Sequence, residues 1–160
     1  MKNFQIIGLV LLLAVSFGVV SNAAVQDVTN LNNSGAGSLR QAIADANAND
    51  TIQFAENLAG GTINLESEIA FGTTVTIIGP TSGHTTISGG DTTRIFNITG
   101  GNLNKVTITG IRFANGFADQ DSGGAIIIVG PSLELNHCIF DSNRAFCNTV
   151  DCDADGGAIV

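Results

Sequence analysis

The chain has 160 residues, a length that suits a single domain. Its 6 Lys and Arg against 14 Asp and Glu give a formal net charge of −8 at pH 7, and the cations form no basic cluster in the sequence. This acidity excludes nucleic acid and anionic lipid as expected partners, because both attract basic surfaces. With 20 Gly, only 2 Pro and neither Trp nor Tyr, the composition favours short strands and tight turns over helices.

Residues 1–23 have the layout of a secretory signal peptide. Lys2 precedes an apolar run from Ile6 to Val20, and Ser21 and Ala23 follow as small residues in an A-x-A-like arrangement. The alternative is a membrane anchor, but the run is shorter than the roughly 20 residues that a spanning helix needs. We therefore expect cleavage after Ala23 and export. The mature part then has a net charge of −9, because Lys2 is lost, and we expect no transmembrane span in it.

The segment 24–50 contains the one helix that we expect after the leader. Ser38 followed by Gln41 has the capping-box spacing, in which a hydroxyl and a side-chain amide bind the free backbone N–H groups at a helix start. Leu39 and Ile43 share one helical face with Ala42 and Ala46. The pattern therefore predicts a short amphipathic helix at about 38–48.

From Thr51 onward the apolar residues alternate with polar ones. Period-two runs of three to five residues, bounded by Gly, Asn, Asp or Ser, indicate many short strands. The runs are Ile52–Phe54, Ile63–Leu65, Val75–Ile77, Ile95–Ile98, Val106–Ile108, Ile111–Phe113, Ile126–Ile128, Leu133–Leu135 and Ile139–Phe140.

The strand pattern also repeats itself. VTITGIRF at Val106–Phe113 is echoed by LELNHCIF at Leu133–Phe140, 27 positions later, and VTII at Val75–Ile78 precedes VTIT by 31. SGGAI at Ser122–Ile126 recurs 33 positions later as DGGAI at Asp155–Ile159. The 27-residue alignment matches Val106 with Leu133, Ile108 with Leu135, Ile111 with Cys138, and Phe113 with Phe140. Such periods are typical of a solenoid, whose stacked rungs bury a continuous core that one rung alone could not form.

We therefore predict an all-β fold for residues 51–160: a right-handed parallel β-helix, preceded by the helix as a cap. The main alternative is an antiparallel sandwich. A sandwich needs two-residue hairpin turns, and the dipeptides that make them are scarce here.

Two groups of motifs resemble known bacterial surface proteins. GSLRQAIADANA followed by DTIQF resembles the N-terminal segment of CSLREA-type proteins, with Gly37 in place of the family's Cys and Gln41 in place of its Glu. The two GGAI units and the Phe-x-x-Asn unit resemble repeats of the chlamydial polymorphic outer membrane proteins. The matching residues are Gly123, Gly124, Ala125, Ile126, Phe140, Asn143, Gly156, Gly157, Ala158 and Ile159.

The resemblance covers about residues 28–160 and implies a surface-exposed or secreted right-handed β-helix. Members of this group are often passengers of an autotransporter or carry a C-terminal sorting signal, and adhesion is their usual proposed role. Because the chain stops at Val160 inside a repeat, we expect an N-terminal fragment or a truncated reading frame. We expect Leu39 and Ile43 of the helix to cover the first rung, with Arg40 and Asp45 facing water.

One acidic loop is a candidate cation site. Asp151, Asp153 and Asp155 stand at alternate positions before Gly156, as at the start of a Ca²⁺-binding loop. A related loop, Asp119–Asp121, also precedes a GGAI unit, and the alternative in both cases is a solvated acidic turn.

The cysteines are candidates for a structural role. Cys147 and Cys152 are spaced for a disulfide within the acidic loop, which an oxidising compartment permits. Cys138 is expected inward as a small apolar residue. A zinc site from the three cysteines with His137 is a poorly spaced alternative.

The leader, the cap and the repeats together predict an exported surface protein without catalysis, acting as an adhesin-like or structural passenger. Its ligand would be a host receptor or a polysaccharide. The alternative is a carbohydrate-active β-helix enzyme, a lyase or hydrolase that uses Ca²⁺. Candidates for its chemistry are few: Arg94, Lys105 and Arg112 are the central cations, Asp91 is the acid nearest to them in sequence, and His84 and His137 lie in unrelated contexts.

Overall fold

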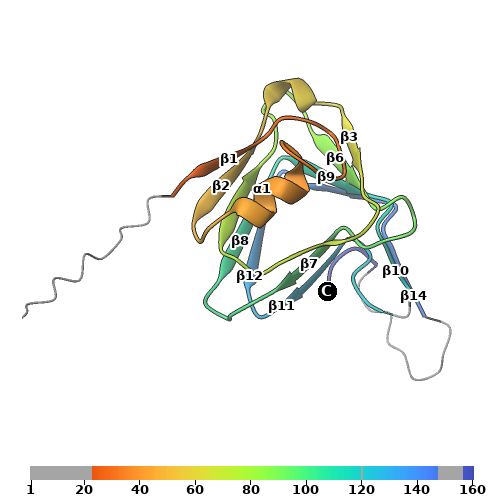
Figure 1. Ribbon diagram of the computed structural model, residues 1–160. Coiled ribbons are helices and arrows are strands. Elements are labelled where there is room, and N and C mark those ends of the chain that lie inside the picture. The colour runs from red at the N-terminus through yellow and green to blue at the C-terminus, as the bar shows by residue number, and fades with distance from the viewer. Residues whose placement is uncertain (1–22, 120, 148–156) are drawn as a thin grey trace, which may run out of the picture.

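A computed structural model describes residues 23–119, 121–147 and 157–160, so most of the predicted signal peptide lies outside the described residues. These residues are mostly strands, which coil into a parallel β-solenoid of about four turns with one short α-helix (Figure 1). Every strand pair in the described residues is parallel. The predicted parallel β-helix is therefore confirmed, and the antiparallel sandwich is excluded.

The strands form three main faces and a short fourth sheet. The first face has five strands, in the order β1 (Val25–Val28), β2 (Asp50–Phe54), β5 (Val75–Ile78), β8 (Lys105–Thr109) and β12 (Ser132–Asn136). The second face consists of β3 (Thr62–Asn64), β6 (Thr85–Ser88), β9 (Ile111–Ala114) and β13 (Ile139–Asp141). The third consists of β4 (Ile69–Phe71), β7 (Phe96–Thr99) and β11 (Ile126–Val129). The fourth pairs β10 (Phe117–Asp119) with β14 (Arg144–Phe146).

The core fills the space between the faces with ladders of aliphatic and aromatic side chains. On the first face Ile52 lies opposite Ile77, and Ile77 lies opposite Ile108. All three are fully buried. Phenylalanines from successive turns also touch edge to face, Phe71 on Phe96 and Phe96 on Phe113, with ring centroids 5.4 and 5.5 Å apart. Stacking therefore makes one continuous core from rungs that are each too small to form one.

The register follows the spacings read from the sequence. Val106 pairs with Leu133, Ile108 with Leu135, and Phe113 with Phe140, as the 27-residue repeat predicts. Val75 and Val106 pair across the 31-residue repeat. The two GGAI units meet at a parallel bridge between Ile126 and Ile159.

Helix α1 (Leu39–Asp45) lies across the end of the solenoid at β1, where it packs on β1, β2 and β4 (Figure 1). Leu39, Ala42 and Ile43 are buried, so the helix covers the first rung as expected. It ends earlier than the predicted residue 48. Ala46 already has an extended backbone, with φ −70° and ψ 133°. A second helical element, the single 3₁₀ turn η1 (Glu56–Leu58), was not predicted.

Two details of the predicted cap are wrong. The Ser38 hydroxyl does accept a hydrogen bond from the Gln41 backbone N–H, but the Gln41 side chain donates to Asp45 and does not accept from the Ser38 backbone N–H. The Ser38 backbone N–H binds the Gly35 carbonyl instead, so the reciprocal half of the capping box is not needed. Arg40 does not simply face water, because its guanidinium donates to the carbonyls of Ser67 and Glu68 in the first turn.

Candidate functional site

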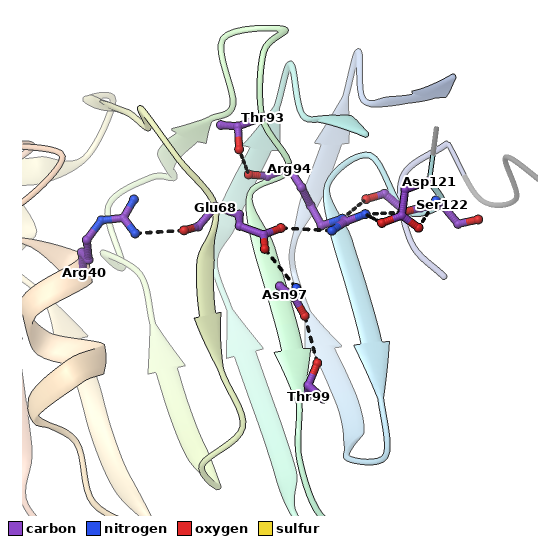
Figure 2. A network of polar contacts seen from close by, with 9 residues as sticks. Arg40, Glu68, Thr93, Arg94, Asn97, Thr99, Asp121 and Ser122 are labelled. Carbon is purple, nitrogen blue, oxygen red and sulfur yellow. Dashed lines mark hydrogen bonds and ion pairs between the residues drawn. The ribbon is translucent and has the colours of Figure 1, made fainter. Parts of the chain in front are cut away.

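A buried arginine joins three successive turns of the solenoid (Figure 2). Arg94 lies just before β7. Its guanidinium binds the Glu68 carboxylate, just before β4, at 3.0 Å. It also binds the Asp121 carboxylate, in the loop that leads to β11, at 2.6 Å. It also donates to the backbone carbonyls of Ser122 and Gly123. The Arg94 side chain is only 9% exposed, so both ion pairs are shielded on the cation's side.

The network around Arg94 is complete. The second oxygen of Glu68 accepts from the Asn97 side-chain amide, and the Thr99 hydroxyl donates to that amide's oxygen. The Arg94 guanidinium is the main cause that holds the pKa of the Asp121 carboxyl below its ordinary 3.8. Among the described residues no buried polar side-chain atom lacks a hydrogen-bond partner. This network is a strut along the axis of the solenoid, with its polar groups engaged by one another.

The other central cations are also paired across turns. Lys105 on β8 binds Glu134 on β12 at 2.5 Å, and Arg112 on β9 binds Asp141 on β13. Asp91, the acid nearest to these cations in sequence, pairs instead with Arg144, 53 positions later, at 2.7 Å. The solenoid therefore distributes its cations as ties between rungs and does not gather them at one place.

The two histidines do share a site, contrary to the sequence-based expectation. His84 precedes β6 and His137 follows β12, at the corner between the first and second faces. The His84 Nε2 lies 2.9 Å from the His137 carbonyl oxygen. A carbonyl can only accept, so this nitrogen carries the proton and donates it. The contact spans 53 positions, which local sequence pattern does not reveal.

These histidines line a groove of about 280 Å³. Three turns contribute to it, with the lining residues Ile78, Gly79, Pro80, Thr81, Gly83, His84, Thr109, Gly110 and His137. The Glu56 carboxylate holds one wall in place by accepting from the backbone N–H groups of Thr81 and Ser82. A groove lined by the apolar Ile78 and Pro80 together with two histidines and two threonines is suited to binding a sugar ring or a peptide side chain. We call this surface the histidine groove.

The repeat motifs have local structural roles. Asn143 reaches back one turn, where its side-chain oxygen accepts from the Gly116 backbone N–H at 2.8 Å and its amide donates to the Phe113 carbonyl at 3.0 Å. At Gly124 a Cβ atom would lie 2.4 Å from the backbone oxygens of Arg144 and Gly157. Gly123 has a φ of +68°. The GGAI and Phe-x-x-Asn units are therefore stacking devices of the solenoid.

The predicted cation site falls outside the described residues, since Asp151, Asp153, Asp155 and Gly156 are not among them. In the related loop the Asp121 carboxylate is engaged by Arg94. Within residues 23–119, 121–147 and 157–160, no group of three or more His, Cys, Asp or Glu is placed to hold a metal ion.

The cysteines differ in state. Cys147 is disulfide-bonded, and Cys152 lies outside the described residues. Cys138 is free and partly buried against the core, and burial raises the pKa of its thiol. The pairing of Ile139 with Arg112 continues to Cys138 and Ile111, as the repeat alignment predicts, and Cys138 packs against the core. Its partly buried thiol, with a raised pKa, is a poor nucleophile.

The fold and these contacts define a parallel β-solenoid whose rungs are tied together by cross-turn ion pairs. No family model, curated protein or solved structure matches the chain. In the described part of the chain, the search for a helix of sufficient length and hydropathy to cross a bilayer found none.

Proposed function

We propose that this chain is an exported, non-catalytic surface solenoid that acts as an adhesin-like or structural passenger. The signal-peptide layout of residues 1–23 supports export, and the CSLREA-like and GGAI motifs support a place at the cell surface, in the outer membrane or outside the cell. A stack of rungs suits surface display. Each added rung contacts only its neighbours and lengthens the rigid solenoid without a change in the rest of the core.

The observation that carries the non-catalytic part is the pairing of the cations. A polysaccharide lyase needs a basic group free to abstract a proton or to stabilise developing charge. Arg94, Lys105 and Arg112 each hold a carboxylate of a neighbouring turn, so each is committed to joining rungs. Chemistry at any of them would first break a tie of the solenoid.

The histidine groove is the surface that we propose for ligand contact. Its ligand would be a sugar unit of a polysaccharide or a side chain of a host receptor, as expected for an adhesin. Thr81 and Thr109 supply hydroxyls beside the apolar Ile78 and Pro80, an arrangement that recognises an amphipathic group.

Cell fractionation and a binding assay test this proposal. The full-length product with its leader, expressed in an exporting bacterium, should leave the cytoplasm, and the purified protein should bind a glycan or host-cell surface. A His84→Ala and Thr109→Ala double variant should lose that binding while its melting temperature changes little. Retention of the full-length product in the cytoplasm would refute the proposal.

The second candidate is a carbohydrate-active enzyme, and the histidine groove is the observation that favours it. Histidine is the commonest general acid and base, and two histidines line this one groove. The protein should be incubated with polyuronides, with and without Ca²⁺, and unsaturated products followed by their ultraviolet absorbance. Product formation that His84→Ala abolishes would establish the enzyme and overturn the non-catalytic proposal.

A further inference from the structure

One carboxylate occupies a position that the solenoid otherwise fills with aliphatic side chains. Asp50, the first residue of β2, lies opposite Val75, which lies opposite Val106, which lies opposite Leu133. All four positions point inward, and Asp50 is 1% exposed. An acid buried at the capped end of such a ladder needs partners, because an unpaired buried charge is strongly destabilising.

The partners of Asp50 come from the backbone on either side of it. Its Oδ1 accepts from the Ala24 N–H at 2.7 Å and its Oδ2 from the Asn47 N–H at 2.8 Å. The Ala24 carbonyl in turn accepts from the Thr51 N–H at 2.8 Å, so Ala24 is held at both its nitrogen and its oxygen. The hydrogen bond from Ala24 is the largest cause of a lowered pKa of the Asp50 carboxyl, which stays ionised.

Ala24 is also the residue that cleavage after Ala23 would make the first of the mature chain. Hydrolysis of the Ala23–Ala24 peptide bond consumes one water and leaves a carboxylate on Ala23 and an amine on Ala24. An α-amino group has a pKa of about 7.7–8.0, so this amine takes up a proton at neutral pH. A neutral amide donor 2.7 Å from Asp50 thereby becomes a positive charge at the same place.

We propose that removal of the leader creates an ion pair between the α-ammonium of Ala24 and the carboxylate of Asp50, which locks β1 onto β2 at the capped end. The inference rests on the proposed export, because it needs a leader peptidase. It assigns Asp50 as the receptor for the new N-terminus. The exported form is then more stable than the form that still carries its leader, since a charge-assisted hydrogen bond is stronger than a neutral one.

The pairing depends on the exact first residue. One additional residue before Ala24 returns its nitrogen to an amide and moves the charge away from Asp50. Gln26 and Asn47 contribute only uncharged side chains near the carboxylate. Asp27 on β1 is an exposed acid close by in sequence, and it provides a matched control for loss of one negative charge.

The test compares two chains, one that begins at Ala24 and one that begins at Ala23, each released from a fusion that leaves no foreign residue. We expect the chain that begins at Ala24 to melt several degrees higher. Asp50→Asn should abolish that difference because the amide keeps an acceptor without charge, and Asp27→Asn should preserve it. Equal melting temperatures in the wild-type pair, or a difference that survives Asp50→Asn, would overturn the inference.

Two measurements keep the outcome decisive. If Asp50→Asn does not fold, titration of the ¹⁵N-labelled α-amine replaces it: the amine at Ala24 should have a higher pKa than the amine of the chain that begins at Ala23, and equal values refute the pair. N-terminal sequencing of the exported product separates this inference from the proposed function. A product that is exported but begins elsewhere refutes the inference alone, whereas an unexported product refutes the proposed function.

Discussion

The ring of Phe140 stacks on the ring of Phe113 one turn away, with centroids 5.0 Å apart and ring planes inclined by 16°. Three residues further along, Asn143 binds the carbonyl of that same Phe113. The Phe-x-x-Asn unit thus grips the preceding turn twice, once through its ring inside the core and once through its amide at the corner. Both named residues of the unit therefore tie this turn to the preceding one.

Asn143→Ala should destabilise the fold by about 2 kcal/mol, because it removes two hydrogen bonds and leaves the Phe113 carbonyl and the Gly116 N–H without their partner. Urea denaturation followed by circular dichroism measures this. Asn136→Ala is the control, since the Asn136 side chain donates to the exposed Glu134 carboxylate and its loss should cost about 0.5 kcal/mol or less. Equal costs for the two variants would contradict the role assigned to Asn143.

Arg94→Met should destabilise the fold by about 2 kcal/mol, because it removes both ion pairs of a buried guanidinium and leaves the Ser122 and Gly123 carbonyls without this donor. Lys105→Met is the matched change at an exposed pair, where the lysine side chain is 55% exposed, and should cost about 1 kcal/mol or less. The comparison uses denaturation midpoints at a single pH. Similar losses at both positions would mean that the Arg94 network is not a strut.

Gly124→Ala should destabilise the fold by about 3 kcal/mol or prevent its formation. The new methyl group would lie 2.4 Å from two backbone oxygens, and backbone cannot move aside as a flexible side chain can. Gly101→Ala is the control because a Cβ atom there meets nothing within 4 Å. Thermal melting of the two variants tests the explanation of the Gly-Gly pair, and an unchanged melting temperature for Gly124→Ala would disprove it.

Stability should fall as the pH is lowered from about 5 to 2. The pKa of Asp121 is lowered chiefly by its hydrogen bond from Arg94, so this carboxyl binds protons less readily when folded than when unfolded. Its contribution is therefore present above the ordinary pKa of 3.8 and is lost as the pH falls through the folded value. Asp121→Asn should lower stability at pH 6 and flatten the acid decline. A decline of unchanged steepness in Asp121→Asn would show that this pair does not contribute.

Much of the fold follows from local pattern. Alternation of apolar and polar residues tells which side chains point inward, and the 27-residue repeat tells which inward residues stack, as Phe113 and Phe140 do. Ser38 predicts the start of the helix, because its hydroxyl accepts a hydrogen bond from a backbone N–H of the first turn. The predicted end of the helix was wrong by three residues because a turn into β2 replaces its last predicted turn. Asp50, a residue of the first face, binds Asn47 and draws the chain into β2.

Polar contacts between different turns could not be predicted from a local sequence pattern. Arg94 has partners 26 and 27 positions away in opposite directions, and His84 meets His137 across 53. Asp50 could have been suspected, because it stands where the next three turns have Val75, Val106 and Leu133, but its partner Ala24 could not. The register between turns depends on the summed lengths of irregular loops, and only the coiled chain adds those lengths together.

The amino-acid sequence by itself thus predicts a stacked parallel solenoid with a helical cap. Burial of a periodic apolar face is a local property that repeats many times along the chain. Which charges meet, which histidines share a groove and which acid receives Ala24 emerge only in three dimensions. These are single contacts between distant residues, and each depends on the geometry of every loop that separates them.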